Sequence, residues 1–311
     1  MHNKIAGIFL LLLFLSGSLI SQSVYDFLRL DASPKAAALA GSYVAGTEDP
    51  DVIYYNPAAI NTLEGTPVSF SYLNHLLDIN AANISASHVF EDWGRFGAAL
   101  QYINYGEFTK ADEYGNRLGE FSAYDMVLIL GYANEIDKNF NYGVNFKVIQ
   151  SAISDQSSSA VAADIGVNYL IPESKWVFGF SALNIGSQIS SYLDAKEDLP
   201  LDIRIGFSKE LAHMPFKFYF SINHLNEDAD QFLDRFKQFT VGGEFRLSKV
   251  IKLRFGYDNE KRKELKIGTT AGLAGFNIGL GVKVSDYFVD YAFSSLGSIG
   301  AFHRIGIATS F

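Results

Sequence analysis

Apolar and polar residues alternate over most of this chain, and that alternation constrains the fold more than any other feature. From about Thr66 to Phe311 there are roughly fourteen strand-like segments, most of about ten residues, the length with which a tilted strand crosses a bilayer. A period of two gives each strand two distinct faces. In segment 201–208 one face is Leu201, Ile203, Ile205 and Phe207, and the other is Asp202, Arg204, Gly206 and Ser208. The pattern predicts an all-β protein.

The connections between these segments distinguish a membrane barrel from a soluble sandwich, which shows the same alternation. Short connections lie at 91–94, 134–139, 171–174, 210–213, 248–249 and 285–286. Longer ones lie between them, at 74–79, 106–119, 152–157, 186–198, 225–236, 258–273 and 296–301. In outer-membrane barrels tight periplasmic turns alternate with longer external loops. We therefore predict a transmembrane outer-membrane β-barrel of about 14 antiparallel strands over residues 66–311.

The first residues have the features of a secretory signal. Lys4 precedes an apolar run from Ile5 to Leu15, and small residues such as Ser18 and Ser21 follow it. The run is too short to span a bilayer, and its charge and flanks are those of a signal peptide. We expect a signal peptide at 1–21 and a mature protein in the cell outer membrane.

Composition excludes several other classes of protein. The chain contains no cysteine, so neither a disulfide nor a cysteine-linked lipid anchor is expected. Its formal net charge of −9 argues against nucleic acid as a partner, because phosphate-binding surfaces are basic. Aromatic residues make up 14% of the chain, which fits the aromatic girdles that border the apolar band of an outer-membrane barrel.

Residues 22–65 differ from the strand-like segments that follow and are predicted to form an N-terminal plug inside the barrel. One short helix is predicted here. Asp31 or Ser33 would cap its start, Pro34 would occupy its first turn and Gly41 would end it. Further on, Asn56, Pro57 and Ala58 are predicted to form a rigid structural corner, because Pro57 fixes its own φ and favours an extended Asn56. The alternative is an ordinary surface helix and turn in front of a domain.

The predicted lumen faces carry many glycines and several charges. Glycine inside a strand indicates close approach of other groups, and a plug would supply that approach; strand curvature is the competing explanation. These glycines are Gly97, Gly131, Gly143, Gly166, Gly179, Gly206, Gly256 and Gly279. The charged positions Asp202, Arg204, Lys217, Lys252 and Arg254 either form ion pairs that hold the plug or line a solvated channel.

We find no pattern that indicates catalysis, a cofactor or a metal. There is no nucleophile elbow and no phosphate loop. The histidines that follow the predicted signal peptide show no metal-ligand spacing: His75, His88, His213, His224 and His303. The loop at 225–236 is acidic, and it either binds a divalent cation or a basic partner or is a solvated loop tip. A non-enzymatic protein is expected, with no catalytic, cofactor-binding or metal residues.

Several blocks of sequence resemble the long-chain fatty acid transporter superfamily of outer-membrane barrels. More narrowly they resemble its Bacteroidota branch, the PorV/PorQ family of type IX secretion. The blocks at 25–30 and 54–58 and the Ala-rich helix between them are similar to the plug of that superfamily. Those at 101–108, 121–125, 183–188 and 199–202 are similar to PorQ-like rather than PorV-like members. Phe311, at the end of the last strand, resembles the C-terminal signal by which barrels reach the outer-membrane assembly machinery.

The resemblance implies a non-enzymatic component of the type IX attachment complex that anchors a PorZ-like surface protein through its external loops. PorU- and PorV-type components, outer-membrane lipid and lipopolysaccharide would be its neighbours, and no contact residue can be assigned. The wider superfamily implies the alternative, a transporter or channel for long-chain fatty acids or other hydrophobic small molecules. A porin-like role is a third reading. In an anchor the plug would stay in place and close the lumen, whereas in a transporter it would move and act as a gate.

Overall fold

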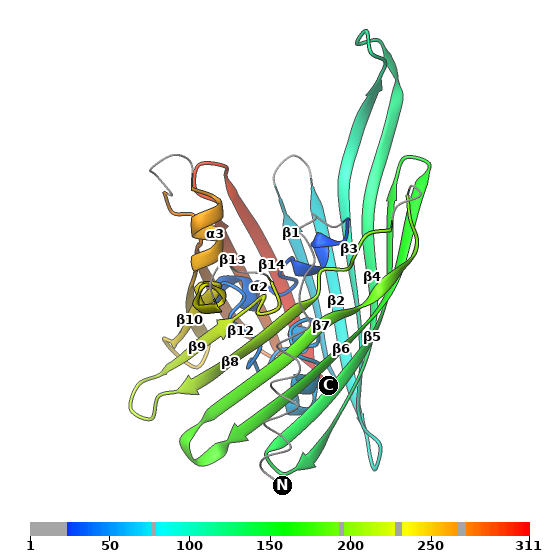
Figure 1. Ribbon diagram of the computed structural model, residues 1–311. Coiled ribbons are helices and arrows are strands. Elements are labelled where there is room, and N and C mark those ends of the chain that lie inside the picture. Colours follow the sequence, from blue (N-terminus) through cyan, green and yellow to red (C-terminus); the bar gives the residue numbers. More distant parts are fainter. Residues whose placement is uncertain (1–23, 76–78, 193–195, 228–231, 267–271) are drawn as a thin grey trace.

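Fourteen antiparallel strands, all within the described residues, close into one barrel in the computed structural model of the protein (Figure 1). The structure describes residues 24–75, 79–192, 196–227, 232–266 and 272–311. Each strand pairs with its neighbours in sequence, and the first pairs with the last to complete the wall. The predicted signal peptide at 1–21 lies outside the described residues.

The strand bounds follow the chain without a crossover. They are β1 (Pro67–Asn74), β2 (Asn80–Phe90), β3 (Gly94–Ala111), β4 (Arg117–Asp137), β5 (Phe140–Ile153), β6 (Gln156–Ile171), β7 (Trp176–Ser190), β8 (Asp202–Glu210), β9 (Phe216–Ile222), β10 (Phe239–Arg246), β11 (Ile251–Asp258), β12 (Phe276–Val284), β13 (Tyr287–Ser295) and β14 (Ala301–Ser310).

Short helices precede the wall and connect some of its strands. They are η2 (Asp26–Arg29), α2 (Pro34–Ala38), η3 (Pro50–Tyr54), η4 (Pro57–Thr62), η5 (Pro172–Ser174), η6 (Phe232–Lys237) and α3 (Asn259–Glu264). The first four lie inside the barrel, in blue in Figure 1. In the part of the chain that the structure describes, no helix has the length and apolar character needed to cross a membrane.

The predicted alternation of faces is present in the wall. In β8, Asp202 and Ser208 are fully buried toward the lumen, whereas Ile205 between them is 38% exposed on the outside. Rings crowd the outer surface, as in the stacked pair Trp176 and Phe178, whose centroids are 5.6 Å apart. An apolar outside with aromatic rings is the surface that a bilayer requires.

Three predicted loops are wrong in detail. The connection expected at 186–198 begins only after Ser190, the last residue of β7. Residues 106–119 and 152–157 were expected to be long connections, but β3 and β4 continue to a turn at 112–116, and β5 and β6 meet at residues 154 and 155. The extended β3–β4 ribbon projects beyond the rest of the wall in Figure 1. Above the membrane both faces of a ribbon meet water, so the backbone pairing persists while the apolar alternation that marks a strand disappears.

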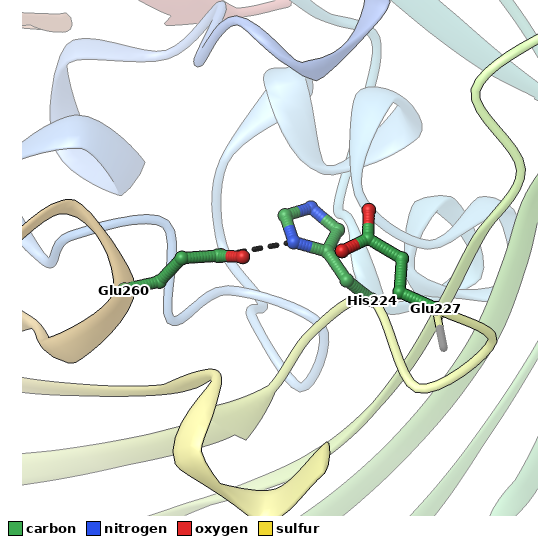
Figure 2. A group of neighbouring side chains, drawn as sticks. All are labelled: His224, Glu227 and Glu260. Atoms are coloured by element: carbon green, nitrogen blue, oxygen red, sulfur yellow. Dashed lines mark hydrogen bonds and ion pairs between the residues drawn. The ribbon is translucent and has the colours of Figure 1, made fainter. Parts of the chain in front are cut away.

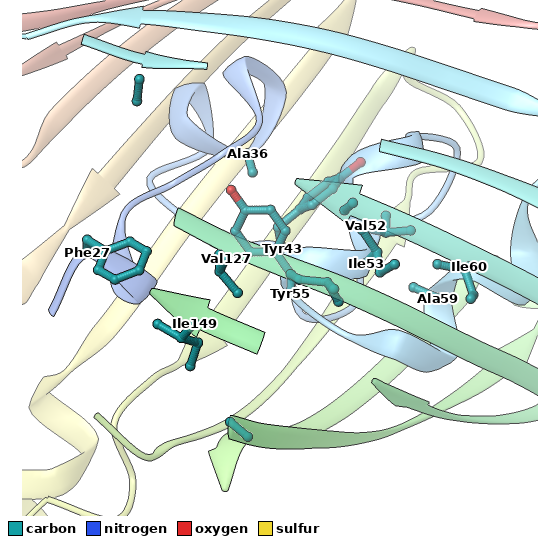
Figure 3. Packing of buried hydrophobic residues seen from close by; sticks show 14 of the residues in the cluster. Phe27, Ala36, Tyr43, Val52, Ile53, Tyr55, Ala59, Ile60, Val127 and Ile149 are labelled. Atoms are coloured by element: carbon teal, nitrogen blue, oxygen red, sulfur yellow. The ribbon is translucent and has the colours of Figure 1, made fainter. Parts of the chain in front are cut away.

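The interior is filled by the plug and not by the wall alone. The main cluster of buried apolar side chains joins plug residues such as Tyr43, Ile53 and Ile60 to wall residues such as Val127 and Ile149 (Figure 3). The predicted short helix is α2: the Ser33 side chain accepts a hydrogen bond from the Ala36 amide, and Pro34 occupies the first turn. The described part of the segment before β1 thus packs inside the barrel, and its role as a plug stays a prediction.

Candidate functional site

A belt of wall glycines lies directly against the plug. A Cβ added at Gly143 would lie 2.5 Å from the backbone of Pro57 and Ala58, and one at Gly179 would lie 2.3 Å from the Val44 carbonyl oxygen. All eight glycines predicted to face the lumen have a plug atom among the nearest neighbours of such a Cβ. The close approach of the plug therefore explains these glycines without any appeal to strand curvature. The belt also includes Gly242, which meets Leu39, and Gly306, which meets Pro34.

The predicted corner lies at the centre of this packing. Asn56 is extended, with φ −159° and ψ 109°, and its Oδ1 accepts a hydrogen bond from the Ala58 amide at 3.1 Å. Its Nδ2 donates to Asn168 Oδ1 in the wall at 2.6 Å and to the Val44 carbonyl at 2.9 Å. One buried amide thus joins the corner, an earlier turn of the plug and strand β6. Pro57 opens η4 and Ala58 is fully buried.

Charged wall residues also hold the plug. Arg304 Nε donates to the Asp31 carbonyl at 3.2 Å, and Lys217 Nζ donates to Thr47 Oγ1 at 3.0 Å. Arg95 donates to the Leu63 carbonyl at 2.6 Å, where the plug joins β1. All three cationic side chains are almost completely buried.

Four of the five lumen charges predicted from sequence take part in ion pairs. Arg204 Nη2 lies 2.5 Å from Asp202 Oδ2, and Arg254 Nε lies 2.8 Å from Glu244. Lys252 is 3.9 Å from the same glutamate. Of the two interpretations left open by the sequence, paired charges around the plug agree with this geometry better than a solvated channel does.

One plug carboxyl is buried in an unusual setting. Asp51 accepts hydrogen bonds from the hydroxyls of Ser69 and Ser85, the second at 2.7 Å. Burial, with the nearby negative charge of Asp49, raises the pKa of Asp51 to about 7, although the two serines act in the opposite direction. This carboxyl therefore carries a proton below neutral pH while it is held in the folded lumen.

A cavity of about 310 Å³ opens at the end of the barrel where the longer connections lie, and we call it the loop-end cavity. Apolar side chains from the plug and the wall line it, including Phe27, Leu30, Ile103 and Phe302. Arg304 also lines it, is 3% exposed and forms no ion pair within the part of the chain that the structure describes. Arg29, Lys261, Asp26 and Asp31 line it too, so the cavity combines apolar side chains with charges of both signs, among which the Arg304 guanidinium is the most deeply buried.

A second cavity, of about 440 Å³, lies at the opposite end, beside the tight turns. Its lining is largely ionic and includes Lys35, Glu48, Lys252 and Asp290. The two cavities share no lining residue, and the buried core of the plug lies between them.

Three side chains that the sequence left scattered meet above the plug. His224 follows β9, Glu227 comes three residues later and Glu260 belongs to α3; Figure 2 shows them facing one another. His224 Nδ1 lies 2.9 Å from Glu260 Oε2, and its Nε2 lies 3.5 Å from Asp202. Burial lowers the pKa of His224, but the Asp202 and Glu260 carboxylates outweigh burial and raise it above its ordinary value. The spacing of residues in the sequence did not indicate that Glu260 lies beside His224, because the two are more than 30 residues apart along the chain.

Phe311 lies at the end of the last strand. Its backbone pairs with Thr66, and its side chain is 81% exposed. Its predicted role as an assembly signal stays a prediction.

Solved outer-membrane barrels have a similar structure. The toluene transporter TbuX of Ralstonia pickettii aligns with a TM-score of 0.60 at 10% identity, over 90% of this chain and 98% of that chain. A FadL homologue of Pseudomonas aeruginosa aligns with a TM-score of 0.57 at 9% identity, over 90% and 98%. The toluene transporter TodX of P. putida gives a TM-score of 0.55 at 10% identity over the same shares. No protein-family model and no curated protein matches the sequence.

These comparisons concern the fold, since identities near one residue in ten establish no more. The predicted closed barrel and its outer-membrane placement are confirmed, because the structural neighbours are FadL-family outer-membrane barrels. The narrower membership in the PorV/PorQ branch stays a prediction.

Proposed function

We propose that the protein is an outer-membrane uptake barrel that binds small hydrophobic molecules with an anionic end in the loop-end cavity. The observation that carries this proposal is Arg304, a buried guanidinium without an ion-pair partner in the described chain, set beside Phe27 and Phe302. A buried charge is costly unless it is paired, so a ligand carboxylate at this position would be bound strongly. The structural neighbours include toluene transporters and a monoaromatic hydrocarbon channel, which supports a hydrophobic cargo.

Binding of two probes to the purified barrel tests the proposal. Dodecanoate offers a carboxylate and an apolar chain, whereas toluene offers only an apolar ring. We expect Arg304→Met to weaken dodecanoate binding about 10-fold or more, because a charge-assisted hydrogen bond contributes about 1.5–3 kcal/mol. Toluene binding should change little. Lys283→Met is the matched control, since Lys283 is an exposed cation near the opposite end of the barrel.

Two results would overturn the proposal. One is the absence of binding of either probe to the wild-type barrel. The other is an equal loss of dodecanoate binding in the Arg304 and Lys283 variants, which would place the effect outside the cavity.

A second function is supported by the projecting β3–β4 ribbon. Among the described residues, β2 pairs with β3 only as far as Asn104, and the tip of the ribbon carries exposed Tyr114 and Leu118. A two-stranded ribbon is marginally stable alone in water, so a partner protein would stabilise it. We propose that, in an anchor of the type IX kind, this ribbon holds a PorZ-like surface protein, with PorU- and PorV-type components and lipopolysaccharide beside it.

Recovery of partners from membranes tests the anchor. Residues 106–119 would be replaced by a two-residue Asn-Gly turn, and the loops at 186–198, 225–236 and 258–273 would be shortened in separate variants as controls. The anchor predicts loss of the surface partner from the ribbon variant alone. Retention of that partner after all four regions are shortened would refute it.

A further inference from the structure

We propose that His224, Glu227 and Glu260 form a binding site for a divalent transition-metal ion such as Zn²⁺ at the loop end of the barrel. Each residue offers one ligand atom, and these atoms all lie within 4.8 Å of one another. Ligand atoms on one zinc ion with bonds of about 2.0–2.2 Å lie roughly 3–4 Å apart, so small side-chain rotations complete the geometry. The inference goes beyond the proposed uptake function and does not depend on it.

The three ligands come from two separate connections. His224 and Glu227 belong to the β9–β10 connection, and Glu260 lies in the first turn of α3 after β11. All three side chains are partly buried, so they are held in place and remain accessible to an ion from outside. Figure 2 shows the imidazole between the two carboxylates, the arrangement in which a central cation would be shared.

The charges around the cluster favour a cation. Beside His224 lie four carboxylates, those of Asp202, Glu227, Glu260 and Glu264. Two guanidinium groups face them: Arg204 pairs with Asp202, and Arg29 lies 2.8 Å from Glu227 Oε1. Carboxylates thus exceed guanidinium groups by two, and a divalent ion would neutralise that excess.

The donor set selects the class of metal. An imidazole nitrogen with two carboxylate oxygens suits zinc and neighbouring transition metals, whereas calcium and magnesium prefer oxygen ligands alone. Three protein ligands leave a position for water, as in an open zinc site. The Asp202 carboxylate, 3.5 Å from His224 Nε2, would orient the imidazole from the side away from Glu260.

A bound ion would brace the loop end of the barrel. It would join the β9–β10 connection to α3, and through the pair between Glu227 and Arg29 it would fix η2 of the plug. Arg29 also lines the loop-end cavity. Metal binding would therefore stiffen one wall of that cavity without entering it.

The test uses the full-length barrel in detergent, titrated with Zn²⁺ alone and with Ca²⁺ alone while thermal unfolding is followed. We expect Zn²⁺ to raise the melting temperature and Ca²⁺ to leave it unchanged. His224→Asn and Glu260→Gln should each weaken the apparent zinc affinity about 100-fold or more, because removal of a residue that only hydrogen-bonds to a metal ligand already costs up to about 100-fold. His213→Asn, in the exposed β8–β9 turn, is the matched control and should respond as the wild type does.

Cobalt binding gives a readout that does not depend on stability. Co²⁺ should produce a visible absorption band in the wild type and the His213 variant, and none in the His224 variant. No effect of Zn²⁺ on the wild type, or an equal response in the His224 and His213 variants, would overturn the proposal.

Discussion

The glycine belt leads to a quantitative prediction at Gly143. Alanine at this position would place its Cβ 2.5 Å from the Ala58 amide nitrogen and from the Pro57 carbonyl carbon. Ordinary contacts begin at 3.4 Å, so plug and wall must separate by about 1 Å. Both neighbours are backbone atoms and cannot rotate away. The φ of Gly143 lies outside the left-handed region, so the substitution acts through packing and not through backbone strain.

The expected magnitude follows from two opposing effects. Overpacking costs about 1–3 kcal/mol, and alanine recovers roughly 0.5–1 kcal/mol relative to glycine through the unfolded chain. We expect Gly143→Ala to lower the free energy of unfolding by about 2 kcal/mol, near the upper limit because the contacted atoms are backbone. Urea-induced unfolding of the refolded barrel, followed by tryptophan fluorescence, measures this change.

Gly243→Ala provides the matched control. Gly243 is also inside a strand, but the three atoms nearest to a Cβ there are ring ends of Phe216 and Phe255, which can move. Its stability should stay within about 0.5 kcal/mol of the wild type. Equal stability of the Gly143 and Gly243 variants would refute the inference that the plug presses against the glycine belt.

Further predictions concern the other contacts of the plug. Asn56→Ala should destabilise the barrel by about 1–3 kcal/mol in the same unfolding assay, because it leaves the Ala58 amide and the Val44 carbonyl without their partner. A free energy of unfolding equal to that of the wild type would contradict the structural role of the corner. Arg95→Met should cost a similar amount, since the Leu63 carbonyl then loses its donor. In the wild type, the raised pKa of Asp51 means that the folded state keeps a proton which the unfolded chain releases above about pH 4. The free energy of unfolding should therefore fall as the pH rises from 4 toward 7, by at most about 1.4 kcal/mol per pH unit, and then level off. Asp51→Asn should remove that slope, and a slope equal to that of the wild type would disprove the assignment.

The wall could be predicted from sequence because membrane strands obey a strict period of two. Ile205 faces outward and Asp202 inward as the alternation required, and the alternation of short and long connections gave the strand number. The belt could also be predicted, since glycines such as Gly143 and Gly179 sit inside strands where they would otherwise weaken the pairing.

Other features of the structure depend on tertiary contacts, which local sequence patterns do not indicate. The β3–β4 ribbon was mistaken for a loop because its residues, such as Glu107 and Lys110, are solvated on both faces. The meeting of His224 with Glu260 depends on how two connections fold back over the plug. Arg304 was not among the charges singled out from the sequence, and its lack of an ion-pair partner among the described residues could be seen only in the structure.

Crosslinking the plug to the wall tests most directly whether the two are packed together in the barrel that binds the ligand. Asn61 and Asn141 are suitable positions, because Asn61 Nδ2 donates to Asn141 Oδ1 at 2.7 Å across the boundary between plug and wall. The chain has no cysteine, so Asn61→Cys with Asn141→Cys gives a unique pair for a short thiol crosslinker. We predict efficient crosslinking, with dodecanoate binding and ion conductance in planar bilayers unchanged by it. Poor crosslinking in the folded barrel, or a loss of uptake or conductance that reverses on cleaving the crosslink, would show instead that the plug is a moving gate.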